Sequence, residues 1–429
     1  MRMERVNDFY KKRIADKLLD EALDTTGAVL IEGAKWCGKT TTGLRHAKSV
    51  IRIDDPAEIE RNIIMSKLNP TLLLGGETPR LVDEWQLAPK LWDAARYAID
   101  SRRKNGQFIF TGSSTPVESK EITHSGAGRF SFVLMRTMSL FESGDSNGSI
   151  SLGDLFDGKK INEAKNNLDL ERLAFLLCRG GWPDACLNSN KYPLKKAHAY
   201  VDALLRGDFQ RVDETLRDIE KAKRLLRSLS RNQGGQVSLN TLCQDVNNGS
   251  TFLSDVTAAS YIRALKKIYV EEDLPAWSPN LRSKTAIREQ EKRYFTDPSI
   301  AVACLGIGPD DLLRDLKTFG FLFEAMCIRD LRVYASSLDG EVFHYRDKSN
   351  LECDAVIHLR SGKYGLIEIK LGDDLGVEKG AASLKKLNAK LDEEKMGSPS
   401  FMMILTGVGA FSYRRNDGIY VVPLGCLKN

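Results

Sequence analysis

A glycine-rich loop between an apolar run and a helical pattern is the feature that most constrains this fold. The segment GAKWCGKT, residues 33–40, has the spacing G-x-x-x-x-G-K-[ST], follows the apolar run 28–31 and leads into a helical pattern. Gly33 and Gly38 permit main-chain conformations in which successive N–H groups point at phosphate oxygens. The positive end of the following helix adds to this attraction. The sequence therefore predicts a phosphate-binding loop in a parallel α/β fold.

This loop also predicts how a nucleotide and a metal ion are held. Lys39 is expected to reach the β- and γ-phosphates of ATP, and the Thr40 hydroxyl is expected to bind Mg²⁺. The predicted nucleotide-binding residues are contiguous in the chain: Gly33, Ala34, Lys35, Trp36, Cys37, Gly38, Lys39, Thr40 and Thr41.

Two adjacent carboxylates end a later apolar run. The short strand pattern 80–82 is followed directly by Asp83 and Glu84, with one strand–helix unit between them and the loop. Asp83 is predicted to hold Mg²⁺, directly or through water. Glu84 is predicted to polarise the attacking water as a general base. With Lys39, these two side chains are the first candidates for catalytic residues in nucleotide hydrolysis.

Two further candidates have two interpretations each. The strand pattern 107–110 leads to Ser113 and Ser114, either of which is a γ-phosphate sensor or a cap for the next turn. Arg129 follows a glycine-rich tripeptide and precedes the apolar run 130–135. It either reaches a γ-phosphate, in its own subunit or a neighbouring one, or lies exposed at a strand edge. The neighbouring-subunit option implies a homo-oligomer.

The chain divides by pattern into three predicted domains. Residues 1–165 alternate apolar runs with helical patterns, as in a parallel α/β sheet. Residues 166–310 are mainly helical, and residues 311–429 begin with a long helix followed by strands. The runs expected to be strands in the first domain are 28–31, 50–53, 80–82, 107–110 and 130–135.

The middle domain has three helical patterns and a possible wing at 270–279, an order that resembles a winged-helix fold. Its basic side chains either contact nucleic-acid phosphates or form a solvated face: Arg217, Lys221, Arg224, Arg231, Arg263, Lys266 and Lys267. The formal charge of +5 is divided as +2, +3 and 0 over the three domains. This excess is small for a dedicated DNA-binding domain, so nucleic acid is the weaker expectation as a partner.

The C-terminal domain contains a second group of charged side chains. Asp354 lies on one strand pattern, and Glu368 and Lys370 alternate to one face of the next strand, across a hairpin turn. This arrangement resembles the D…E-x-K core of the PD-(D/E)XK nuclease fold, with Glu324 as an acid on a preceding helix. The resemblance implies a second Mg²⁺ site at Asp354 and Glu368, near Glu324 and Lys370. The domain either cleaves nucleic acid or serves as a binding or structural module.

Six segments in order carry a wider resemblance. They are LIEGAKWCGKTTT, LVDEWQ, FIFTGSS, GAGRF, the GG-W-P run at 180–183 and the K-Y-F-D pattern at 292–297, with 319–371 after them. The chain resembles a widespread family of bacterial and archaeal AAA+/STAND-like ATPases with a C-terminal domain of unknown function. The resemblance implies ATP binding and hydrolysis. Trp36 and Cys37 stand where smaller or other residues are usual, which leaves the affinity for nucleotide open.

Other features exclude several classes of protein. No stretch of 18 apolar residues exists, so a membrane-spanning helix is not expected. The N-terminal segment lacks the pattern of a secretory signal, and the eight cysteines contain no C-x-x-C pair. We therefore expect reduced thiols and a cytoplasmic location. Three functions remain: an ATPase that drives conformational change in its C-terminal domains, an ATP-regulated nuclease, and a nucleotide-dependent interaction module without useful turnover.

Overall fold

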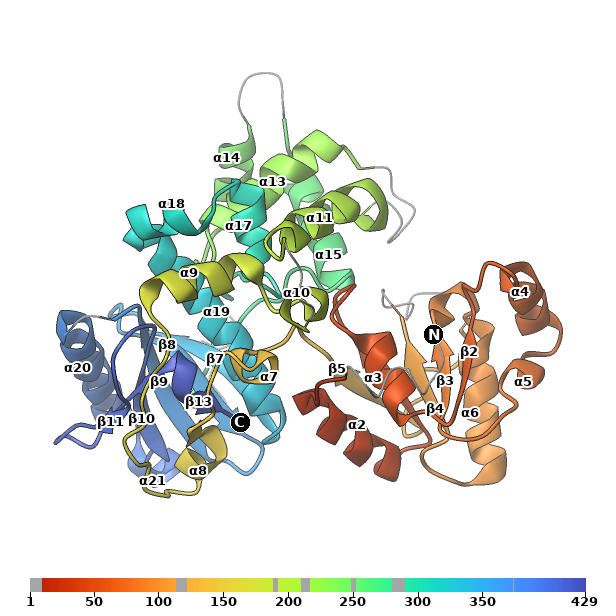
Figure 1. Cartoon of the computed structure of the whole chain (residues 1–429), viewed down its shortest axis with the longest axis horizontal. Helices are drawn as coiled ribbons and strands as arrows, with labels where there is room; N and C mark the ends of the chain where they lie inside the picture. Colours follow the sequence, from red (N-terminus) through yellow and green to blue (C-terminus); the bar gives the residue numbers. More distant parts are fainter. Residues whose placement is uncertain are drawn as a thin grey trace. The chain divides into compact units, whose positions relative to one another are not determined.

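The structure is a computed structural model that describes residues 10–112, 122–187, 192–209, 217–247, 252–279, 290–372 and 374–429 (Figure 1). The chain forms two compact units. The first comprises Met1–Thr137 with Lys267–Tyr269, and the second comprises Met138–Lys266 with Val270–Asn429. The units are described one at a time below.

A five-stranded parallel sheet forms the centre of the first unit, with the strand order β2-β3-β4-β1-β5. The strands fall at the five apolar runs predicted from the sequence, and no strand end differs from its predicted position by more than one residue. Their bounds are β1 Ala28–Glu32, β2 Ser49–Arg52, β3 Arg80–Asp83, β4 Phe108–Thr111 and β5 Phe130–Leu134. Because every strand is parallel, all of their carboxyl ends lie at one edge of the sheet.

Both faces of this sheet are covered by helices, as a buried parallel sheet requires. Alternate strand residues pack on opposite sides: Leu30 and Phe110 belong to the core beneath α5 and α6, whereas Ile31 and Ile109 belong to the core beneath α2 and α3. The helices are α2 Ile14–Thr25, α3 Lys39–His46, α4 Ile59–Leu68, α5 Pro70–Leu73, the short 3-10 turn η1 Trp85–Leu87 and α6 Lys90–Arg102.

The second unit begins with a largely helical part. Its elements are α7 Leu140–Ser143, β6 Ile150–Ser151, α8 Leu152–Phe156, α9 Leu170–Arg179, α10 Pro183–Leu187, α11 Lys195–Ala203, the π-helical turn η2 Leu204–Asp208, α13 Ile219–Arg231, α14 Leu239–Val246, α15 Asp255–Lys267, α17 Ser299–Leu305 and α18 Pro309–Arg314. The helices α13, α14 and α15 match the three predicted helical patterns.

A short antiparallel pairing follows these three helices. It consists of isolated bridges between Glu271 and Phe295 and between Leu274 and Lys292. Residues 280–289, between the paired segments, lie outside the described part of the chain. This pairing has the place of the predicted wing, and the winged-helix interpretation itself stays a prediction. Arg217 is buried and donates to the carbonyl of Phe209, so it belongs to neither of the two alternatives given for it, a phosphate contact or a solvated face.

The C-terminal part of the second unit is a mixed six-stranded sheet with the order β11-β12-β10-β9-β8-β7. Strands β7, β8 and β9 are antiparallel neighbours, whereas β9, β10 and β12 are parallel. The elements are α19 Leu316–Ser336, β7 Gly340–Arg346, β8 Glu352–Leu359, β9 Tyr364–Lys370, α20 Asp374–Lys390, α21 Glu393–Met396, β10 Phe401–Thr406, β11 Tyr413–Arg414, β12 Tyr420–Pro423, the 3-10 turn η3 Leu424–Cys426 and β13 Leu427–Lys428.

The compact units divide the chain earlier than the predicted boundary at residue 165. Residues 138–165 belong to the second unit, where β6 pairs in parallel with β13 near the end of the chain. The Ser146 hydroxyl donates to the carbonyl of Leu427 at 2.7 Å. Residues 144–160 are rich in Gly, Ser and Asp, a composition typical of a domain boundary, and pairing between residues so far apart in sequence leaves no local pattern that would correct this interpretation. Among the described helices, none combines the length and the apolar character needed to cross a membrane.

An aromatic cluster in the first unit generates a prediction about stability. Trp92 on α6 stacks on Phe130 at 3.7 Å between ring centroids and lies 5.0 Å from Trp85. Trp92→Ala should lower the free energy of unfolding by about 3–5 kcal/mol because it opens a cavity under the sheet. Tyr97→Ala on the same helix removes a side chain that is 68% exposed, and should cost less than about 0.5 kcal/mol. Urea denaturation followed by circular dichroism measures both, and equal losses would contradict this packing.

Candidate functional site

The phosphate-binding loop connects β1 to α3 and has the backbone that its glycines permit. Gly33 has φ +143°, and a Cβ atom there would lie 2.0 Å from the Met135 carbonyl oxygen. Gly38 caps α3 with φ +108°, and Trp36 also has a positive φ, of 67°. Because Met135, the residue after β5, approaches this closely, no larger residue fits at Gly33. The Trp36 side chain is 47% exposed beside the loop.

The side chain of Lys39 closes the loop. Its ammonium group donates hydrogen bonds to the carbonyl oxygens of Gly33 and Ala34, both at 2.8 Å, and the residue is only 8% exposed. Ala34 and Cys37 are buried, whereas Lys35 is exposed. The ammonium group therefore lies over the loop, where phosphate oxygens would be the stronger partners for a cation.

Asp83 joins the loop helix to the carboxyl edge of the sheet. Its Oδ1 accepts hydrogen bonds from the Thr40 hydroxyl at 2.8 Å and from the Thr111 hydroxyl at 2.6 Å. The strand register pairs Asp83 with Thr111 directly. The two predicted motifs thus meet in space. Thr111 was not predicted as a site residue, because its role depends on β4 lying beside β3, which the sequence does not show.

Glu84 follows Asp83 in a left-handed conformation, with φ 55°. The amide of Gln86 donates to its Oε2 at 2.5 Å. Burial is the main cause that raises the pKa of Glu84, and the charge of Asp83 adds to it. The Gln86 hydrogen bond and the charge of Lys39 act in the opposite direction. A carboxylate with a raised pKa beside the loop has the properties of a general base.

The remaining two candidates do not join this group in the described structure. Ser113, with Ser114, lies outside the described residues. Arg129 precedes β5, so it lies at the amino edge of the sheet, whereas the loop follows the carboxyl end of β1. The five-residue strand separates the two edges by roughly 16 Å. Arg129 pairs there with Asp100 at 2.8 Å and is half exposed.

An arginine close to the N-terminus supports the loop from behind. The buried guanidinium of Arg13 donates to the carbonyl of Cys37 at 3.0 Å and to that of Arg136 at 2.9 Å. It therefore ties the loop to the segment after β5. Nothing in the local sequence distinguishes Arg13 from the neighbouring lysines, so sequence analysis did not find it.

A polar network connects α2 to the loop helix α3. His46 bonds through Nε2 to Asp16 at 2.9 Å and through Nδ1 to Asp20 at 2.8 Å. The Tyr10 hydroxyl lies 2.7 Å from Asp16 and 2.8 Å from the Thr42 hydroxyl. Burial lowers the pKa of His46, but the bonds and charges of the two aspartates outweigh it and raise the pKa.

The C-terminal charges also converge, within the second unit. Lys370 Nζ lies 2.7 Å from Glu368 Oε2 and 3.1 Å from Asp354 Oδ2. The β8–β9 pairing brings Asp354 opposite Glu368, as the predicted hairpin requires. In addition, the amide N–H of Ile369 donates to Asp354 at 2.8 Å. The lysine thus holds both acids together.

Glu324, on α19, completes this cluster with two residues that sequence analysis missed. It accepts hydrogen bonds from the Tyr294 hydroxyl at 2.6 Å and from Lys292 at 3.1 Å. Lys292 and Tyr294 come from the short antiparallel pairing and belong to the K-Y-F-D pattern at 292–297, which the sequence analysis used for the resemblance but not as part of a site. We call Glu324, Lys292, Tyr294, Asp354, Glu368 and Lys370 the C-terminal charge cluster.

Burial and neighbouring charges shift the pKa values of two acids of this cluster in opposite directions. Burial, then the charge of Asp354, raises the pKa of Glu368 to about 8. Burial also raises the pKa of Asp354, but the charges of Lys370 and Lys292 outweigh it and hold that pKa below its usual value. Within the described residues, no group of three or more His, Cys, Asp or Glu side chains is arranged to hold a metal ion. The second Mg²⁺ site therefore stays a prediction.

Comparison with protein families gives three successive matches along the chain. Residues 25–143 match an AAA domain, residues 170–311 match a domain of unknown function (DUF8612), and residues 319–427 match another (DUF4143). The AAA match includes the loop, Asp83, Glu84 and Thr111. A comparison with curated proteins found no match.

Among solved structures, this chain is similar to a Walker-type ATPase of Pyrococcus abyssi, with 14% identity and a TM-score of 0.43 over 70% of this chain and 96% of that one. It is also similar to the Orc1 protein of Aeropyrum pernix in complex with DNA, with 14% identity and a TM-score of 0.23 over 72% of this chain and 96% of that one. Both TM-scores are below 0.5, and we draw nothing further from them.

The sequence match and the sheet agree on the general class of the protein. It is an α/β protein with an N-terminal AAA domain of the P-loop ATPase type, a helical middle part and a C-terminal mixed sheet. The two C-terminal domains have no assigned function.

The His46 network predicts how stability depends on pH. Because the folded pKa of His46 is raised, its stabilising effect is complete below the unfolded value of about 6.5 and is lost as pH rises through the folded pKa. His46→Gln should therefore destabilise the chain at pH 5.5 more than at pH 9. Urea midpoints at the two pH values measure this difference. His124→Gln, at an exposed position, is the matched control, and a His46 effect independent of pH would contradict the assignment.

Proposed function

We propose that the chain binds ATP with Mg²⁺ in the loop of residues 33–41 and hydrolyses it. The observation that carries this proposal is that Asp83 accepts hydrogen bonds from both Thr40 and Thr111. These two bonds join the loop helix to the carboxyl edge of the sheet. Ligands of open parallel sheets bind at this edge. The AAA match over 25–143 supports the same conclusion.

The residues present suit a nucleotide and its metal ion. Met135, the residue after β5, approaches Gly33 so closely that no Cβ atom fits there. The loop therefore begins with bare main chain, which can come into close contact with phosphate. Thr40 and Asp83 provide hydroxyl and carboxylate oxygens, which are the ligands that Mg²⁺ prefers. Lys39 would leave its two carbonyl partners to neutralise phosphate charge. When bound, Mg²⁺ supplies charge stabilisation for the transferred phosphoryl group.

Glu84 would act on the attacking water. Its raised pKa makes it a better proton acceptor than an ordinary surface carboxylate, and the Gln86 hydrogen bond orients it. Thr111 is a positioning residue in this scheme, since it holds Asp83 rather than the nucleotide. Arg129, at the other edge of its own sheet, would contribute only to the site of a second copy in a homo-oligomer.

The experiment compares Lys39→Ala and Glu84→Gln with wild type in the binding of a fluorescent ATP analogue and in phosphate release. Lys39→Ala should lose nucleotide affinity because the loop loses its cation. Glu84→Gln should bind normally and release phosphate about 10²- to 10⁴-fold more slowly, because general base catalysis is lost. Lys48→Ala, at an exposed position just after α3, is the matched control.

Two results would contradict parts of this mechanism. Equal phosphate release by wild type and Glu84→Gln would exclude Glu84 as the base. Nucleotide binding by wild type without any release of phosphate would favour an interaction module that uses ATP only as a ligand. If turnover is found, we propose that it drives conformational change in the C-terminal domains.

A second candidate function is Mg²⁺-dependent cleavage of nucleic acid at the C-terminal charge cluster. The convergence of Asp354, Glu368 and Lys370 on β8 and β9, with Glu324 nearby on α19, is the observation that favours it. An acid with a raised pKa beside an ionised acid and a lysine is suited to moving a proton. The absence of a net basic charge in residues 311–429 counts against strong binding of a phosphate backbone.

Plasmid DNA and structured RNA, each incubated with Mg²⁺ or Mn²⁺, test this candidate. Cleavage should be lost in Asp354→Ala, which removes one of the two acids at Lys370. Asp347→Ala, just after β7 and paired with Lys390 at 2.7 Å, is the control and should cleave normally. Failure of wild type to cleave either substrate would leave the cluster as a structural or binding element.

A further inference from the structure

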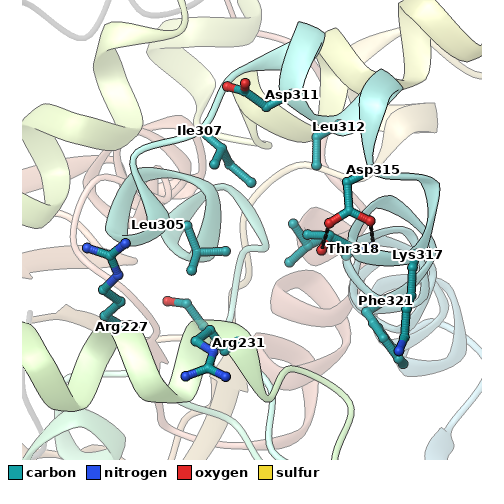
Figure 2. Close-up of a pocket in the computed structure, with 12 residues that line it drawn as sticks. Arg227, Arg231, Leu305, Ile307, Asp311, Leu312, Asp315, Lys317, Thr318 and Phe321 are labelled. Atoms are coloured by element: carbon teal, nitrogen blue, oxygen red, sulfur yellow. Dashed lines mark hydrogen bonds between the residues drawn. The ribbon is translucent and has the colours of Figure 1, made fainter. Parts of the chain in front are cut away.

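A cavity in the second unit shares no lining residue with either candidate site. Its volume is about 430 Å³, within the range of pockets that hold small molecules. It is lined by α13, the end of α17 with the turn after it, α18 and the first turns of α19 (Figure 2). The two matched domains of unknown function, 170–311 and 319–427, both contribute to it. Ligand sites occur preferentially at such junctions.

One part of the cavity wall is apolar, and the rest of its lining is polar or charged and includes Lys317. Leu305, Ile307 and Leu312 lie between Arg227 and Asp315 in Figure 2, and Phe321 lines the wall from α19. Leu312 is fully buried, whereas Phe321 is 48% exposed. Such a surface favours the apolar body of a ligand over water.

Two guanidinium groups on α13 lie at the wall of the cavity. Arg227 and Arg231 are four residues apart, so they occupy one face of the helix. The guanidinium of Arg227 makes no hydrogen bond or ion pair with any residue that the structure describes. Arg231 is 3.8 Å from Asp245, and its side chain is 64% exposed. Arg227 is therefore available to an acid, and Arg231, although paired with Asp245, is exposed enough for an external acid to approach it.

The two carboxylates at the cavity are already engaged. Asp315 caps α19, where it accepts from the Thr318 amide at 3.1 Å and from the Thr318 hydroxyl at 2.6 Å. These bonds lower the pKa of Asp315 and keep it ionised. Asp311 accepts from the Gly308 amide at 2.9 Å. Helix capping directs these two acids to backbone amides, and in the described residues neither of them pairs with Arg227 or Arg231.

We propose that this cavity binds a small organic anion, in which one acidic group is joined to an apolar body. The acidic group would pair with Arg227 and Arg231, because a guanidinium matches the oxygens of a carboxylate or phosphate in two parallel hydrogen bonds. The apolar body would cover Leu305, Ile307 and Phe321. This site is independent of the proposed ATP site, which lies in the other unit.

A basic helix surface for nucleic acid is the alternative for these arginines. Arg224 lies on the same exposed face of α13 as Arg227 and Arg231 but does not line the cavity. A phosphate backbone would use all three arginines, whereas a ligand in the cavity would use only Arg227 and Arg231. Arg224 is therefore the matched control.

The test is a fluorescence titration of the full chain with 8-anilino-1-naphthalenesulfonate, an organic anion with an apolar body. Wild type should bind it saturably, and Arg227→Ala should bind it about tenfold or more weakly because a charged hydrogen-bond partner is lost. Arg231→Ala should weaken binding in the same direction, and Arg224→Ala should match wild type. Displacement of the probe by octanoate and by octyl phosphate tells whether a carboxylate or a phosphate is preferred.

Three outcomes would overturn the proposal. The first is equal affinity of the probe for wild type and Arg227→Ala. The second is that the neutral analogue N-phenyl-1-naphthylamine binds in the cavity as tightly as the anionic probe does, since the site would then recognise only an apolar body. The third is duplex DNA binding that Arg224→Ala and Arg227→Ala weaken equally, which would assign α13 to a nucleic-acid surface. Thermal unfolding of each variant verifies that it is folded.

Discussion

The buried carboxylate of Asp83 is the interaction on which the geometry of the first unit depends. It is 5% exposed, and a carboxylate that is this far from water requires hydrogen-bond donors around it. The donors are Thr40, in the first turn of the loop helix, and Thr111, at the end of β4. One side chain thus joins two strands and the loop. Lys39 and Glu84 are the chain neighbours of Thr40 and Asp83, and for this reason their charges act on the same small volume.

The local part of this site could be predicted from the sequence because it depends on adjacent residues. The glycines, Lys39 and Thr40 have chain positions that determine their chemistry, and the strands could be found from their apolar runs. Thr111 and Arg13 could not be identified, because their roles depend on strand order and on a contact between distant segments. Arg129 differs from these two residues. A residue that precedes a strand of a parallel sheet lies at the opposite edge of that sheet from a loop that follows a strand. That rule could have been applied to the sequence alone.

The C-terminal charge cluster combines local and distant contributions in the same way. The hairpin that brings Asp354 opposite Glu368 is a local arrangement, whereas Lys292 and Tyr294 reach Glu324 from the other side of the predicted boundary at 311. Burying so many charges gains little stability, because desolvation offsets the attraction between them. Such a cluster is more easily explained by a role in chemistry or recognition than by a role in holding the fold together. The cost of burial also explains why one of its acids, Glu368, has a pKa near neutrality.

The basic side chains in and before α13 differ in burial, and this difference distinguishes a residue that stabilises the fold from one that can bind a ligand. Arg217 is buried, donates to the carbonyl of Phe209 at 2.8 Å and lies over the rings of Phe209 and Tyr261, so its charge serves the fold. Arg227 has the same charge, but its guanidinium has no partner among the described residues, and it lies at a cavity whose wall is partly apolar. A sequence pattern treats the two alike, because both fall among helical residues with basic neighbours. Only the surroundings of each guanidinium distinguish them, and these favour a discrete anion in the cavity over a phosphate backbone along the helix.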